Sequence, residues 1–208
     1  MRNISCALTK RQIRDRSKTV TRRAGWINKR TGEPIVKRGD ILRFVEKCQG
    51  LKKGEQMTPI AVVRVLGVRR EPLGAIRIEG NRGTSAEGFP EMTRSEFVRF
   101  FLETHRALKS ENDLVTRIEF EYVTLRAGDR VRLRQTGEDL VVAYERDGLI
   151  SWLGWPDGEA RVTDVDVVSL ATDERHADTV AMFHGSTSRR ARIVRELYAG
   201  SLTAEATA

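Results

Sequence analysis

The 208-residue chain is 39% hydrophobic and 32% charged, with a formal net charge of +8. This apolar content excludes a globally disordered chain, and the absence of a long apolar run or leader-like start favours a cytoplasmic protein without a membrane partner. The charge is uneven, because residues 1–126 carry 27 Lys or Arg against 15 Asp or Glu, whereas residues 127–208 carry 10 against 14. We therefore expect the first part to meet a polyanion.

The first part alternates short apolar stretches with turn signals and one clear helical pattern. A helix is predicted over 93–106, where Thr93 and Glu96 form a capping box and Phe97, Phe100, Phe101 and His105 share one face. The glycine-containing stretch 80–92 shows no periodicity and is predicted to be a loop. The remaining expected elements are strands at 3–9, 18–23, 41–47, 58–73 and 114–123, and a brief helix at 9–16 with Thr9 as its N-cap.

The second part has a different pattern, with strands of four to six residues separated by turn signals such as Thr136-Gly137 and Asp147-Gly148. Five such strands predict a small SH3-like β-barrel over 127–171. A helical tail is expected over 172–208, frayed over its last eight residues. The fold class is thus mixed α/β and mainly β: a β-barrel with flanking helices over 1–126, then the small barrel and the tail.

The most basic segment lies within the first 38 residues, which hold 12 Lys or Arg against 2 acidic side chains. Residues 15–26 read DRSKTVTRRAGW, so that hydroxyls alternate with cations and a tryptophan closes the stretch. Such a segment is either the solvated face of an edge strand or a surface that binds nucleic acid. Trp26 either stacks on a base or packs against the core. The candidate binding residues are Arg16, Lys18, Thr21, Arg22, Arg23 and Trp26.

Residues 1–124 resemble an ASCH domain, a branch of the PUA-like fold. The resemblance is carried by the order of the 18–23 segment, the Gly39-Asp40 turn, the Glu87-Gly88-Phe89 loop, the 93–106 helix and the closing strand. The family signature Gly-x-Lys-x-x-(Glu or Thr)-x-Arg aligns with Arg16, Lys18, Thr21 and Arg23, so that only its glycine is replaced.

The resemblance implies a PUA-like cleft that faces nucleic acid or a nucleotide. It extends to ASCH proteins of phages and mobile elements and to bacterial acetylcytidine amidohydrolases, which share a Lys and a Thr three residues apart and a later Glu. Glu87 holds the position of that Glu. Other ASCH proteins are reported to cleave RNA, so a ribonuclease is a further alternative. Residues 129–170 resemble a small uncharacterised bacterial barrel module.

The residues of the signature can support hydrolysis if they meet. Burial and neighbouring cations lower the pKa of a lysine, and a neutral Lys18 can then take the proton of the Thr21 hydroxyl. Glu87 can act as general acid or base, and Arg22 or Arg23 can hold a phosphate or an oxyanion. In a regular strand Lys18 and Thr21 face opposite sides, so they converge only where the chain twists.

The leading hypothesis is a protein that binds RNA, in preference to DNA, or a modified nucleotide in the basic cleft. The alternative is a hydrolase, either an amidohydrolase on an N-acylated cytidine-type nucleoside with Lys18, Thr21 and Glu87 or a ribonuclease. Residues 127–208 are a candidate docking module for a protein partner. The three histidines have no acidic or Cys companions at ligand spacing and no phosphate-binding loop is present, so neither a metal nor another cofactor is expected.

Overall fold

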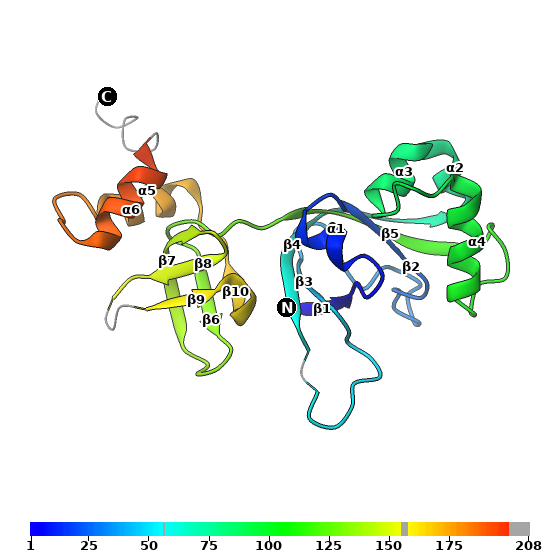
Figure 1. Cartoon of the computed structure of the whole chain (residues 1–208), viewed down its shortest axis with the longest axis horizontal. Coiled ribbons are helices and arrows are strands. Elements are labelled where there is room, and N and C mark those ends of the chain that lie inside the picture. Colours follow the sequence, from blue (N-terminus) through cyan, green and yellow to red (C-terminus); the bar gives the residue numbers. More distant parts are fainter. Residues whose placement is uncertain (56, 155–157, 200–208) are drawn as a thin grey trace. The chain divides into compact units, whose positions relative to one another are not determined.

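A computed structural model of the chain describes residues 1–55, 57–154 and 158–199. The chain divides into two compact units, Met1–Val123 and Thr124–Ala208. The sequence pattern predicts the change of module three residues later, after residue 126. Figure 1 shows the strands and helices of both units in sequence colours.

The first unit is built on a five-stranded sheet with the order β1-β3-β4-β5-β2. β1 and β3 are parallel, and the other neighbours are antiparallel. The strands are β1 (Arg2–Ser5), β2 (Val20–Arg23), β3 (Ile41–Val45), β4 (Pro59–Pro72) and β5 (Leu114–Tyr122). β2 is therefore an edge strand, and only β5 lies beside it in the sheet.

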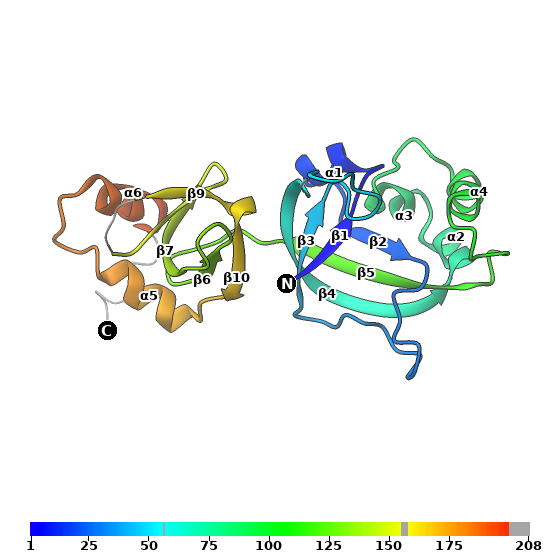
Figure 2. The ribbon, with the colours of Figure 1, turned by 90° about the horizontal axis from the view of Figure 1, so that it is seen from below.

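The two longest strands give the sheet its curvature. β4 pairs with β5 along most of its length, and the register shifts between Val65 and Gly67. Such a bulge bends a strand and increases its twist, and Figure 2 shows β4 and β5 as long curved strands with β2 beside β5. Alternate side chains of these strands, among them Ile118 and Phe120, are buried in the core of the unit.

Short helices gather at one end of this sheet (Figure 2). They are η1 (Leu73–Ala75), α2 (Ile76–Glu79), α3 (Asn81–Ala86) and α4 (Arg94–Thr104), while α1 (Lys10–Arg14) lies between β1 and β2 in the sequence. The capping box predicted for α4 is confirmed, because Thr93 and Glu96 make both of its hydrogen bonds. The prediction of a loop over 80–92 is wrong for 81–86, since α3 is too short to reveal a period in the sequence. Thr9 stands at the N-cap of α1 as expected, but its side chain makes no capping hydrogen bond.

The second unit contains an antiparallel five-stranded sheet with the order β10-β6-β7-β8-β9. Two helices follow it and pack their apolar residues with those of β7 in one cluster. The expected fraying of the last eight residues lies outside the described residues. The elements are β6 (Arg130–Leu133), β7 (Asp139–Arg146), β8 (Leu149–Trp152), β9 (Glu159–Arg161), η2 (Val162–Asp164), β10 (Val165–Ser169), α5 (Asp173–Ala181) and α6 (Arg189–Leu197).

The predicted fold class is confirmed: the molecule is mixed α/β and mainly β, with a curled sheet and flanking helices in the first unit. Within the described part of the chain, no helix has the length and apolar character needed to cross a membrane.

Candidate functional site

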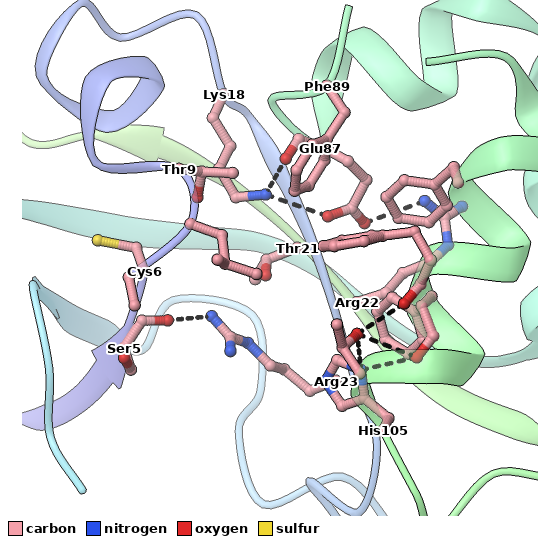
Figure 3. A pocket seen from close by; sticks show the side chains of 16 residues that line it. Ser5, Cys6, Thr9, Lys18, Thr21, Arg22, Arg23, Glu87, Phe89 and His105 are labelled. Carbon is pink, nitrogen blue, oxygen red and sulfur yellow. Dashed lines mark hydrogen bonds and ion pairs between the residues drawn. The ribbon is translucent and has the colours of Figure 1, made fainter. Parts of the chain in front are cut away.

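A pocket of about 170 Å³ opens in the first unit between the segment around β2 and one face of α4. Four segments supply its wall: the turn after β1, the segment that leads into β2, the connection between α3 and α4, and α4 itself (Figure 3). Its lining residues are Ser5, Cys6, Ala7, Leu8, Thr9, Lys18, Thr21, Arg22, Arg23, Glu87, Phe89, Phe97, Phe100, Phe101, Thr104 and His105. The pocket therefore collects most of the residues that the sequence analysis singled out.

Lys18 and Glu87 meet in the wall of this pocket, although 69 positions separate them in the chain. The backbone N–H of Thr19 donates to the carbonyl of Ala86 at 2.9 Å and so fixes the loop beside the segment. The Lys18 Nζ lies 3.1 Å from Glu87 Oε2 and also donates to the Glu87 carbonyl. Both side chains are buried, with 3% and 4% of their surface exposed. Burial lowers the pKa of the Lys18 ammonium, and the nearby Glu87 carboxylate opposes that shift.

Thr21 lines the same pocket, and its hydroxyl makes no hydrogen bond with any described residue. The strand β2 begins only at Val20, so Lys18 lies before the regular pleat, where its N–H donates to the carbonyl of Gln12. This irregular start explains how Lys18 and Thr21 reach one pocket despite a spacing that faces opposite sides of a regular strand.

Arg22 is fully buried and bound to three carboxylates at once. Its Nε donates to Glu71 at 2.8 Å, its Nη2 to Glu79 at 2.7 Å and its Nη1 to Glu87 at 3.1 Å. Desolvation acts against its charge, but Glu87, Glu79 and Glu71 raise its pKa overall. The positive charge of Arg22, one of the predicted binding residues, is therefore already matched by carboxylates inside the protein.

Arg23, the next residue, has a different environment. One of its terminal nitrogens donates to the carbonyl of Ser5, while its Nε is buried without a hydrogen-bond partner. Burial lowers the pKa of its guanidinium. Within the described residues no carboxylate forms an ion pair with Arg23, although its side chain lines the pocket.

Aromatic rings form the opposite wall of the pocket. Phe89 contacts Phe97 and Phe100, with ring centroids 5.6 and 5.3 Å apart. Phe101 stacks on His105 at 4.0 Å, with an angle of 11° between the rings. The sequence placed Phe97, Phe100, Phe101 and His105 on one helical face but did not connect this face with the site. The connection depends on how α4 packs against the loop that carries Glu87, which the sequence pattern alone does not reveal.

The pocket also contains a thiol. Cys6 is 4% exposed, and its Sγ donates to the carbonyl of Val45 at 3.3 Å. Desolvation raises the pKa of this thiol to about 11. Neither Cys6 nor Cys48 forms a disulfide.

Arg16 and Trp26 do not line the pocket. Arg16 has φ of 62°, the left-handed conformation that glycine favours, which explains why a glycine would suit this position of the signature. Its guanidinium lies over the ring of Tyr122, 5.7 Å from the centroid. Trp26 packs against the core of the first unit, which is one of the two roles predicted for it, the other being stacking on a base.

Among residues 1–55, 57–154 and 158–199, no three His, Cys, Asp or Glu side chains are grouped so as to hold a metal ion.

No family model and no curated protein matches the sequence. Several solved structures resemble it. A protein of Enterococcus faecalis that carries the family model DUF984 is 22% identical, and the match covers 55% of this chain and 69% of that chain with a TM-score of 0.38. The hypothetical protein PH0355 is 20% identical over 58% of this chain and 95% of that chain, with a TM-score of 0.39. An ASCH domain from Lactobacillus crispatus is 14% identical over 55% of this chain and 70% of that chain, with a TM-score of 0.35.

Proposed function

We propose that the first unit binds one base of a nucleic acid or nucleotide in the pocket formed by β2 and α4. The observation that carries this proposal is the pairing of an aromatic wall with a polar wall in about 170 Å³. An apolar cavity of roughly 150 Å³ accommodates one benzene ring, so the pocket suits one planar base. Aromatic side chains stack on bases, and polar groups at the opposite side read the edge of the base.

The charge of the chain supports a nucleic acid as the source of that base. Residues 1–126 carry a net charge of +12, and exposed Lys29, Arg30, Lys37 and Arg38 follow β2 in the sequence. Cations on the surface attract the phosphate backbone, whereas the pocket takes a base that is turned out of its stack. We favour RNA over DNA, because of the resemblance to ASCH and PUA-like domains.

Fluorescence anisotropy with labelled single-stranded RNA and DNA at low salt tests this function. We expect the wild type to bind, and Arg23→Met to bind at least about tenfold more weakly, since a charged hydrogen bond contributes about 1.5–3 kcal/mol. Arg64→Met is the control, because Arg64 is exposed on β4, pairs with Glu121 and does not line the pocket. The proposal fails if neither nucleic acid binds, or if the two variants lose affinity equally.

A second function, amide hydrolysis in the same pocket, is favoured by the environment of Lys18. A neutral amine has two N–H groups, which Glu87 accepts through its carbonyl and Oε2. The lone pair of Lys18 then remains for the proton of Thr21, whose hydroxyl is free of hydrogen bonds within the described residues.

In this reaction the Thr21 Oγ forms a bond to the acyl carbon, and its proton passes to Lys18. The C–N bond breaks, and the leaving amine receives a proton that Lys18 and Glu87 relay. Water then cleaves the acyl ester, so that one amide and one water give one carboxylic acid and one amine. The substrate class is an N-acylated cytidine-type nucleoside, as the resemblance to amidohydrolases implies.

Incubation with N4-acetylcytidine and chromatography of the products tests this second function. We expect cytidine to be released at a rate that rises with pH as Lys18 loses its proton, which happens at lower pH than for an ordinary lysine. Lys18→Met and Thr21→Val should each abolish the release. Release that persists in both variants would exclude the mechanism, and no release by the folded wild type would exclude this substrate.

A further inference from the structure

His105 is held in one orientation at the edge of the pocket by three contacts with two neighbours, Phe101 and Thr104. Its ring lies flat on Phe101, with centroids 4.0 Å apart, and its Nδ1 is 3.0 Å from the Phe101 carbonyl oxygen. The same nitrogen is 3.1 Å from the hydroxyl oxygen of Thr104. His105 lines the pocket at the C-terminal end of α4 (Figure 3), so these contacts fix the orientation of its ring there.

These contacts define the tautomer of the ring. A carbonyl oxygen only accepts hydrogen bonds, so Nδ1 must carry the proton that it shares with Phe101. The Thr104 hydroxyl donates to the Phe100 carbonyl at 2.8 Å, which leaves its lone pair to accept from the same Nδ1–H. In the neutral ring Nε2 is therefore an acceptor, and it makes no hydrogen bond with any described residue.

Two other polar side chains of the pocket can donate a hydrogen bond. Arg23 Nε is a buried donor without a partner, and the Thr21 hydroxyl is uncommitted within the described residues. Both oxygens of Glu87 already accept from Lys18 and Arg22. His105 thus adds an unengaged acceptor on the aromatic side of the pocket, opposite the side chains that can donate.

We propose that His105 Nε2 determines specificity in this pocket by accepting a hydrogen bond from the exocyclic amino group of a base. This inference rests on the proposed binding of one base. An amino-bearing base offers an N–H donor next to a ring acceptor, which complements His105 and the Arg23 or Thr21 donor. A keto base places an oxygen lone pair where the amino group would lie, and this oxygen faces the lone pair of Nε2.

Two matched ligand pairs test the proposal: cytidine with uridine, and adenosine with inosine. Each pair exchanges an amino group for a keto group on the same ring. Isothermal titration calorimetry measures the affinity for each nucleoside. For a pair that enters the pocket, we expect the wild type to bind the amino member roughly tenfold more tightly than the keto member. This factor corresponds to one hydrogen bond gained and one repulsion between two acceptors avoided.

Two variants separate recognition from structure. In His105→Asn the amide nitrogen can replace Nδ1–H, but nothing replaces Nε2, so the preference should fall to about one. In His105→Gln the amide oxygen can reach the position of Nε2, so part of the preference should return. Both variants should have closely similar unfolding midpoints, because each removes the same stacking contact with Phe101.

Nitrogen NMR of the histidine ring gives an independent readout. We expect the proton on Nδ1 in the free protein and a ligand-dependent shift of Nε2 with cytidine or adenosine. A proton on Nε2, or an amino preference that survives in His105→Asn, would overturn the inference. Equal binding of amino and keto members by the wild type overturns the inference alone, whereas no binding of any nucleoside or oligonucleotide overturns the proposed function as well.

Discussion

Arg22 lies in the interior of the first unit, where Glu71, Glu79 and Glu87 surround its guanidinium. Arg69 and Arg117 bind Glu79 from the other side, so the network continues toward the surface. A buried cation of this kind holds several carboxylates in place, among them the Glu87 that meets Lys18. Arg22 therefore positions Glu87 within the site, whereas no carboxylate among the described residues pairs with Arg23.

Removal of Arg22 should have a large effect on stability. We expect Arg22→Met to lower the free energy of unfolding by about 3–5 kcal/mol, because it leaves buried carboxylates without their partner. Arg64→Met breaks an exposed ion pair with Glu121 and should cost no more than about 1 kcal/mol. Urea unfolding of the two variants measures the difference, and equal losses would show that the network around Arg22 is not needed for stability.

At the scale of elements, the connection between α3 and α4 positions one residue from each wall of the pocket. Gly88 stands between Glu87 and Phe89 with φ of +86°, a conformation that other residues adopt with strain. A Cβ at this position would lie 3.2 Å from side-chain carbons of Gln12 and Thr9. The turn thus joins the polar wall to the aromatic wall and packs closely against the segment around α1.

Gly88→Ala should disturb both folding and binding. We expect Gly88→Ala to lower the free energy of unfolding by about 1–2 kcal/mol, because alanine is strained in the left-handed conformation. The two close contacts of the added Cβ should lower it further. Gly39→Ala is the matched control, because Gly39 has φ of +91° but nothing lies within 4 Å of its Cβ position. Thermal unfolding should show a loss in both variants, while calorimetric titration should show weakened ligand binding only for Gly88→Ala. Unchanged ligand binding by Gly88→Ala would mean that this turn does not determine the geometry of the pocket.

The sequence predicts the elements that have a period or a cap and misses those that depend on packing. The helix at 93–106 follows from the Thr93 capping box and its aromatic face, whereas α3 has six residues and no period to detect. For the site, Lys18, Thr21 and Glu87 follow from the resemblance to a signature, and the structure brings all three to one pocket. The partners of Arg22 come from β4, from α2 and from the connection after α3, so no local pattern predicts them.

At the scale of the whole chain, the positive charge and the pocket have separate roles. The pocket cations are mostly paired with carboxylates, while exposed cations such as Lys29, Arg30, Lys52 and Lys53 lie in the connections around β3. The charge of these connections is available to phosphates. An oligonucleotide can therefore use both features, whereas a nucleoside can use only the pocket.

Salt should distinguish these two contributions. We expect the affinity for an oligonucleotide to fall steeply with salt, and the affinity for a nucleoside to change little, because a nucleoside displaces no counterions. Replacing Lys29 and Arg30 by Gln should reduce the slope of log affinity against log salt by about 1.4 if both contact phosphates of a single strand. Anisotropy titrations at several salt concentrations measure the slope, and oligonucleotide binding without salt dependence would contradict this division of roles.

Alkylation of the Cys6 thiol can be used to follow the opening of the pocket. Only the thiolate is alkylated, and a pKa of about 11 keeps Cys6 protonated near neutral pH, while Cys48 is less buried. Iodoacetamide should therefore label Cys48 first and reach Cys6 only when the segments around the pocket separate. The labelling rate of Cys6 then measures how often these segments separate. A bound base should lower this rate even if it makes no contact with the Cys6 sulfur.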